Sequence, residues 1–223
     1  MNRLFVTTTL LAGLWATPAL ADPDTLIRAD SAVAGSTFNS LYDIGNAIDG
    51  SGLPAEFTLA DLHGTYLVDN HWTTQWGAIG AGTAWAEFFF DTPQTLGQLH
   101  LWNHRSNGVA SNPHYAVTQF DLQLRDADGQ ILLALDDVAA AGELGSSYTG
   151  GVQSFAFAPT AGVSSVWLRI DRNVSVELFG GTGGYTGLAE VAFGAPIPEP
   201  ESVALMLLGL AAIGARMRRR AAV

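Results

Sequence analysis

The sequence predicts an all-β fold, a sandwich or barrel of antiparallel strands. Several short segments alternate apolar and polar residues, with many aromatic and β-branched side chains, as half-buried strands do. An Asp-Gly pair joins two of these segments, and Gly-rich loops separate the others. Helical periodicity is absent between the two ends of the chain. Strands of this kind without intervening helices indicate antiparallel sheets.

The expected strands follow one another through the middle of the chain. The aromatic run 87–91 comes first, and residues 99–102 alternate after it. Asp128-Gly129 lies between the alternating run 120–124 and the apolar run 131–135, which is typical of a hairpin. Residues 166–170 form the last clear alternation. Trp85, Trp102 and Trp167 lie within strands, so we expect them in the core.

Composition excludes several classes of function. The 223 residues include no Cys, which excludes disulfide scaffolds and cysteine-based zinc or redox sites. The formal net charge is −11, and all ten basic residues are Arg. Nucleic acid is not an expected partner, because binding its phosphates requires a basic surface.

The N-terminus predicts export. Residues 1–21 combine Arg3, an apolar stretch and a final Ala-x-Ala pattern, which signal peptidase recognises, so we expect cleavage before Asp22. The alternative is an uncleaved anchor, but the apolar run is shorter than the roughly 20 residues that a bilayer span needs.

The C-terminus, residues 196–223, has three ordered parts: a Pro-Glu-Pro triplet, an uncharged apolar segment over 203–215 and a cluster of Arg. The charged and proline residues involved are Pro198, Glu199, Pro200, Arg216, Arg218, Arg219 and Arg220. This order resembles the PEP-CTERM sorting signal of Gram-negative bacteria. The resemblance implies a transmembrane helix that anchors the chain briefly in the inner membrane, recognition by an exosortase, and delivery to the cell surface or extracellular matrix. A simple tail anchor is the alternative.

The middle of the chain, residues 22–195, resembles a discoidin (coagulation factor 5/8 type C) domain. The resemblance rests on the order of six blocks, residues 46–50, 84–90, 99–103, 120–129, 166–170 and 187–191. It implies a jelly-roll β-sandwich of the galactose-binding-like class. The chain departs from the usual pattern because it lacks a Cys pair and because residues 53–70 form a long insertion.

The same resemblance implies a structural Ca²⁺ ion where the early Asp-Gly turn meets the last strand. The ligands would be the carboxylates of Asp49 and Glu190, the hydroxyl of Thr73 or Thr74, and carbonyls near Ala47 and Ala189. Such oxygen ligands suit Ca²⁺. Alternatively, Asp49 only forms an Asx-turn with Gly50, and Glu190 is a solvated strand residue.

Polar and aromatic residues in turns next to the expected strands suggest a ligand site. Sugar recognition needs an aromatic face for the ring and directed polar groups for its hydroxyls. The candidates are Trp72, Trp76, Asn103, His104, Arg105, Asn107 and Tyr185. In the alternative interpretation, the segment after Trp102 merely solvates a turn.

Catalytic motifs are absent from the sequence, which has neither a Gly-x-Ser-x-Gly elbow nor a His-Glu-x-x-His pair. We therefore expect an exported, surface-sorted, non-catalytic protein that binds extracellular glycan or exopolysaccharide matrix. Removing both terminal signals removes half of the arginines but only two acidic residues, Glu199 and Glu201. This acidity favours neutral glycan or calcium-bridged contacts. A structural or adhesive matrix protein without a small-ligand site is the alternative.

Overall fold

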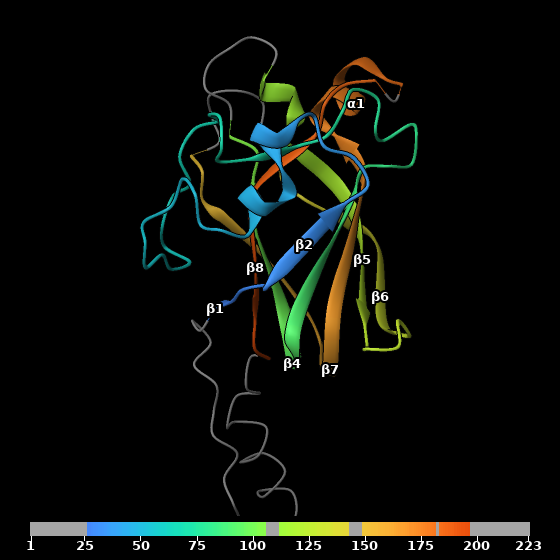
Figure 1. Ribbon diagram of the computed structural model, residues 1–223. Helices are drawn as coiled ribbons and strands as arrows, with labels where there is room; N and C mark the ends of the chain where they lie inside the picture. The colour runs from blue at the N-terminus through green and yellow to red at the C-terminus, as the bar shows by residue number, and fades with distance from the viewer. Residues whose placement is uncertain (1–25, 106–111, 143–148, 182, 197–223) are drawn as a thin grey trace, which may run out of the picture.

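The computed structural model describes residues 26–105, 112–142, 149–181 and 183–196. It confirms the all-β prediction: the fold is a jelly-roll β-sandwich (Figure 1). The strands are β1 (Leu26–Ile27), β2 (Ser31–Ala34), β3 (Trp72–Thr73), β4 (Trp85–Asn103), β5 (Val117–Arg125), β6 (Ile131–Ala139), β7 (Val152–Asn173) and β8 (Gly187–Gly194). The helical elements are η1 (Ser40–Tyr42), η2 (Ile44–Ala47), η3 (Asn112–Tyr115) and α1 (Val174–Phe179).

The long strands β4 and β7 pair with each other and contribute to both layers of the sandwich. Residues 85–89 of β4 pair with 165–169 of β7, and β2 and β5 flank this part. The register shifts between Phe89 and Gln98, and residues 98–102 then pair with 152–156 of β7 and with β8 on the other side. One layer therefore has the order β2-β4-β7-β5-β6, and the other contains β7, β4, β8 and β1.

The core lies between these layers. Phe193 of β8 contacts the rings of Phe88 and Phe90 from β4, at centroid distances of 5.9 and 5.3 Å. Phe120 of β5 contacts Phe155 of β7 at 5.2 Å. Apolar side chains at alternate positions of each strand fill the remaining space. The observed alternation thus explains why sequence periodicity located these strands.

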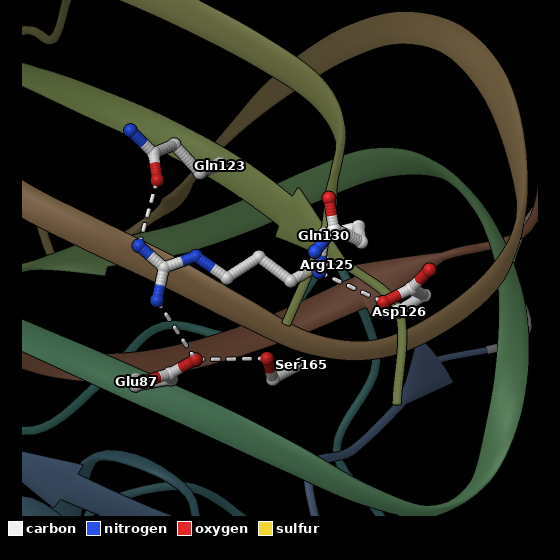
Figure 2. A network of polar contacts seen from close by, with 6 residues as sticks. All are labelled: Glu87, Gln123, Arg125, Asp126, Gln130 and Ser165. Atoms are coloured by element: carbon white, nitrogen blue, oxygen red, sulfur yellow. Dashed lines mark hydrogen bonds and ion pairs between the residues drawn. The ribbon is translucent and has the colours of Figure 1, made fainter. Parts of the chain in front are cut away.

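The outer face of the first layer carries a polar network (Figure 2). The guanidinium of Arg125 donates to Glu87 Oε1 at 3.3 Å and to Gln123 Oε1 at 2.7 Å, and Ser165 Oγ donates to the same Glu87 oxygen at 2.8 Å. Arg125 also lies over the ring of Trp167, 5.3 Å from its centroid. This face is held together by its own side chains.

The expectation that Trp85 and Trp167 belong to the core is wrong. Both are only partly buried, because they share the strand phase of Glu87 and Ser165 and point away from the core. Trp102, by contrast, is fully buried as expected. The Asp-Gly hairpin is confirmed between β5 and β6, where Gly129 has φ +76° and Asp126 Oδ1 accepts the Gln130 N–H (Figure 2).

The helical elements η1, η2, η3 and α1 gather at one end of the sandwich, here called the loop end (Figure 1). The expected insertion 53–70 is a loop without strands that joins η2 to β3. The first and last described strands pair at Leu26 and Gly194, so the described ends of the chain lie side by side. The predicted signal peptide (1–21) and the apolar tail segment fall outside the described residues. Within the described ranges, no helix is long and apolar enough to cross a membrane.

Candidate ligand-binding site

A cavity of about 190 Å³ opens at the loop end and is mostly aromatic. Its lining residues come from five separate segments of the chain: Phe38, Tyr66, Thr73, Tyr115 and Tyr185. We call it the first cavity. Since its walls come from loops that only the folded chain brings together, no local sequence pattern marks it.

Backbone hydrogen bonds fix these loops to the strands beneath them. The N–H of Phe38 donates to the carbonyl of Thr73 on β3 at 2.7 Å. The N–H of Tyr66, in the insertion, donates to the carbonyl of Arg105 just after β4, also at 2.7 Å. Tyr115 ends η3, and Tyr185 lies two residues before β8. These hydrogen bonds and short connections fix the positions of the cavity walls relative to the strands.

Contacts between rings position the aromatic side chains against one another. Tyr185 lies at centroid distances of 5.4 Å from both Phe38 and Tyr115. Tyr66 lies 6.2 Å from Tyr115 with nearly perpendicular planes. The Phe38–Tyr185 and Tyr66–Tyr115 contacts are edge-to-face and the Tyr115–Tyr185 contact is tilted, and such non-parallel arrangements are favourable. An aromatic face suits the apolar side of a sugar ring.

Hydroxyl groups supply the polar part of the first cavity. Thr73 Oγ1 donates to the Tyr66 hydroxyl oxygen at 3.4 Å. Burial raises the pKa of Tyr66 far above its usual value, so this hydroxyl keeps its proton and can itself donate. The cavity therefore offers neutral hydrogen-bond partners.

Beneath Tyr66 lies a cluster of three buried histidines, His63, His71 and His104. The ring of His71 is 4.8 Å from that of His63 and 5.1 Å from that of His104. Tyr66 covers the cluster, with its ring 4.7 Å from His104. His63 and His71 were not identified from the sequence, because isolated histidines 8 residues apart in a loop carry no recognised motif.

Burial favours the neutral forms of His63 and His71 by lowering the pKa of each. Desolvation lowers the pKa of His71 well below its usual value, and the neighbouring imidazoles of His104 and His63 lower it further. The hydrogen bonds agree: Nδ1 lies 2.7 Å from Asn70 Oδ1, which already accepts the Leu67 N–H, and Nε2 accepts the Arg105 N–H at 3.4 Å. A second proton, on Nε2, would point at that N–H donor, and this disfavours the charged form of the His71 ring. Desolvation likewise lowers the pKa of His63.

A second cavity, of about 280 Å³, adjoins the first. Its lining residues are Trp76, His114, Tyr115, Ser175, Phe179, Gly184 and Tyr185. Tyr115 and Tyr185 line both cavities. Two of the residues predicted from the sequence, Trp76 and Tyr185, thus meet at this site, with their rings 5.3 Å apart.

Other predicted ligand residues are placed inside the protein. Trp72 is fully buried in the core, and its indole N–H donates to the Ser36 carbonyl at 3.0 Å. The Asn103 side chain, also fully buried, accepts the Val117 N–H at 2.9 Å and donates to the Val117 carbonyl at 2.8 Å. It joins β4 to β5. His104 is buried in the histidine cluster. These three side chains therefore support the site from below instead of facing it.

Arg105 braces the insertion. Its guanidinium donates to the His63 carbonyl at 2.5 Å, and the His63 N–H donates in turn to the Gly150 carbonyl at 2.7 Å. Arg105 does not belong to the lining of either cavity. Asn107, the remaining ligand candidate, lies outside the described residues.

The predicted metal ligands Glu190 and Asp49 lie close together. Glu190 is fully buried on β8, and its Oε2 accepts the Gly50 N–H at 3.1 Å. Its other oxygen, Oε1, has no hydrogen-bond partner among the described residues. The pKa of Glu190 is raised to about 8: burial raises it most and the charge of Asp49 also raises it, whereas the Gly50 N–H and the charge of Arg28 lower it. A buried carboxylate with an unpartnered oxygen beside a second carboxylate fits a cation.

Thr73 and Thr74 do not share that environment. Thr73 Oγ1 donates to Tyr66, and Thr74 Oγ1 donates to the Gln75 carbonyl while accepting the Thr186 N–H. Both hydroxyls therefore serve other contacts. In the described part of the chain, no group of three or more His, Asp or Glu side chains is arranged to hold a metal ion. Carbonyl oxygens would have to complete the Asp49–Glu190 pair.

Comparison with known proteins identifies the tail and the fold. Residues 196–220 match the PEP-CTERM protein-sorting motif. No curated protein sequence matches the chain. The structure is similar to a fucose-binding module from Streptococcus pneumoniae, with a TM-score of 0.51 and 15% identity over 78% of this chain and 96% of that one.

Two further structures share the fold. A family 32 carbohydrate-binding module of NanJ from Clostridium perfringens, in complex with galactose, has a TM-score of 0.50 and 13% identity over 76% of this chain and 98% of the other. An F5/8 type C domain from Bacteroides fragilis has a TM-score of 0.50 and 18% identity over 77% and 97%. The chain thus joins a discoidin-like β-sandwich to a C-terminal PEP-CTERM sorting motif.

Proposed function

We propose that the sandwich binds a neutral glycan at the loop end. The first cavity carries this proposal, because it combines ring faces from Phe38, Tyr115 and Tyr185 with the hydroxyls of Tyr66 and Thr73. These are the groups that sugar recognition requires. Among the described residues that line it, none is a carboxylate or an arginine. A neutral sugar therefore suits the cavity better than a charged one.

The fold is compatible with a binding role. The similar domains from S. pneumoniae and C. perfringens are described as a fucose-binding module and a carbohydrate-binding module. Such modules bind without catalysing a reaction, so we propose that this protein is not an enzyme. Its ligand specificity would follow from the residues of its own cavity. The similar domains, at 13–15% identity, do not indicate which glycan this protein binds.

The PEP-CTERM motif supports export and sorting. We propose that an exosortase recognises residues 196–220 after the apolar segment has anchored the chain in the inner membrane of a Gram-negative bacterium. The domain would then act at the cell surface or in the extracellular matrix. Glycan in that matrix is the partner this location makes available.

We further propose that Ca²⁺ joins the Asp49 turn to β8. Bound there, the ion would supply positive charge to the carboxylates of Asp49 and Glu190, and its ligand shell would include Glu190 Oε1. The role is structural, since Glu190 lies under the Asp49–Gly50 turn and neither carboxylate lines the first or the second cavity.

Equilibrium binding of neutral oligosaccharides to the purified chain tests the glycan proposal. Tyr66→Phe removes a hydroxyl from the first cavity and should weaken binding about tenfold, whereas Arg125→Gln, on the outer face of the sheet, should leave binding unchanged. Binding to no neutral glycan would contradict the proposal. Retention on matrix proteins alone would instead favour a structural or adhesive role.

A further inference from the structure

We propose that the loop end holds two consecutive sugar residues of one neutral glycan chain, one in each cavity, with Tyr115 and Tyr185 between them. This inference rests on the proposed glycan binding and extends it. It specifies an oligosaccharide, rather than a lone monosaccharide, as the preferred ligand. The observations that carry it concern the second cavity.

The two cavities adjoin at a shared pair of tyrosines. Tyr115 and Tyr185 line both of them, and their rings lie 5.4 Å apart. Tyr185 contacts Phe38 of the first cavity at 5.4 Å and Trp76 of the second at 5.3 Å. A ligand that contacts this tyrosine pair is therefore placed next to both cavities.

The volumes of the two cavities favour a ligand that occupies both of them. Pockets that enclose drug-sized ligands have volumes of roughly 300–1,000 Å³. The first cavity, about 190 Å³, and the second, about 280 Å³, each fall below that range, but the two together fall within it. A single ring would fill one cavity and leave the other to water.

The second cavity has the chemistry of a sugar subsite. Trp76 and Phe179 are 67% and 71% exposed, although large aromatic side chains are usually buried in a soluble domain. Both rings line the cavity, together with Ser175 and His114, whose side chains carry hydrogen-bonding groups. No carboxylate or arginine is among its described lining residues. Its chemistry therefore matches that of the first cavity.

Glycine keeps this second cavity open. Gly184 has φ +118°, a conformation that other residues rarely adopt, and a Cβ there would approach Ser175 Oγ to 2.9 Å. The indole of Trp76 lies over Gly183, where a Cβ would stand 3.4 Å from the ring. Gly183 thus lets the Trp76 ring pack against the backbone of this loop, and a side chain at Gly184 would press on Ser175, which lines the cavity.

The experiment compares the affinities of the purified chain for a neutral monosaccharide and for the di- and tetrasaccharides of the same sugar, by calorimetry. The disaccharide should bind at least about tenfold more tightly than the monosaccharide, and the tetrasaccharide should add little more. Phe179→Ala should remove this gain, so that the disaccharide binds no more tightly than the monosaccharide. Leu178→Ala is the matched control, because Leu178 is also exposed on α1 but lines neither cavity.

Each outcome is decisive. Equal affinity for mono- and disaccharide, or a Phe179→Ala loss that is the same for both, would overturn the two-cavity inference while preserving glycan binding. If the folded parent chain bound none of these sugars, the proposed function itself would be overturned.

Discussion

Glu190 accepts a hydrogen bond from the backbone N–H of Gly50, 140 residues earlier in the chain. The last strand is thereby joined to the turn that follows η2, close to Asp49. This contact places one fully buried carboxylate beside another acidic side chain. In the absence of a cation, such an arrangement costs stability whenever Glu190 is ionised.

Replacing Glu190 with Gln should have opposite effects with and without calcium. In chelator at pH 8.5, Glu190→Gln should raise the melting temperature by about 3–6 °C, because it removes a buried charge whose pKa stands at about 8. In millimolar Ca²⁺, the same variant should melt below the parent, because it loses a ligand. Calorimetric melting of both proteins in both buffers provides the measurement.

Asp91→Asn is the control for this comparison, because Asp91 is exposed at the middle of β4, far along the strand from Trp102, which pairs with Glu190. Its melting temperature should respond to calcium as the parent's does. If the parent protein melts at the same temperature in chelator and in Ca²⁺, the proposal that Ca²⁺ stabilises this site is wrong.

The histidine cluster should make the fold sensitive to acid. The folded-state pKa values of His63 and His71 lie below the unfolded value of about 6.5, so the unfolded chain binds more protons in this window. Stability is then fully present above about pH 7.5 and declines as the pH falls through 6.5 toward the folded values. Each unit of pKa depression corresponds to about 1.4 kcal/mol. Urea unfolding between pH 8 and 5 measures this.

His71→Gln separates the cluster from other acid effects, because Gln cannot titrate yet can still donate to Asn70 and accept from Arg105. The variant should lose less stability than the parent between pH 7.5 and 5.5. His114→Gln, outside the cluster, serves as the control. Identical pH profiles for the parent and His71→Gln would show that the cluster does not govern acid stability.

Gly187 allows β3 to approach β8. A Cβ at Gly187 would come within 2.5 Å of the Trp72 carbonyl oxygen, which belongs to the backbone and cannot move aside alone. Gly187→Ala should therefore lower the free energy of unfolding by about 1–3 kcal/mol. Gly151→Ala, whose Cβ would meet only ordinary contacts at 3.7 Å or more, should change it far less. Equal effects of the two substitutions in denaturant unfolding would contradict this interpretation.

Two tryptophans four residues apart should behave oppositely on truncation. Trp72→Ala empties a fully buried core position and should cost about 3–5 kcal/mol of stability. Trp76→Ala, at a 67% exposed position, should leave unfolding nearly unchanged and weaken oligosaccharide binding. Denaturant unfolding together with calorimetric binding distinguishes the two. A large stability loss in Trp76→Ala would show that its ring serves packing instead of ligand contact.

The mature ends of the protein test the predicted sorting. Mass spectrometry of the chain isolated from a Gram-negative host should find Asp22 at the N-terminus and a C-terminus upstream of the Arg cluster. Replacing Pro198, Glu199 and Pro200 together with Ala should retain the full tail and reduce the amount of protein released from the membrane. A wild-type chain that still carries Arg220 would contradict exosortase cleavage.

Much of the fold follows from the sequence because strands have a side-chain period of two. The runs at 120–124 and 166–170 alternate in the sequence and in the structure alike, with Phe120, Leu122 and Leu168 buried. The Asp-Gly turn at 128–129 is a local device that needs no partner from elsewhere. The same period does not say which phase faces the core when both carry large apolar residues. Periodicity alone therefore places Trp85 and Trp167 on the wrong face of their strands.

The site follows from the sequence only in part. Trp76 and Tyr185, two of the residues that the sequence suggests as ligand contacts, lie with their rings 5.3 Å apart. Trp72 and Asn103 are instead buried, since neighbouring strands and loops cover them. Phe38, Tyr66 and Tyr115 carried no signal, because each is an ordinary aromatic residue until its loop crosses the others.

Local patterns along the chain are thus enough to predict the strand-rich sandwich and the sorting motif. They do not predict which aromatic residues share a cavity or which histidines share a buried cluster. These groups come together because long-range strand pairing positions the loops that carry them, for example by joining both Trp72 and Asn103 to Leu188 of β8. Periodicity along a chain sets the direction of a side chain, whereas pairing between distant segments sets its neighbours.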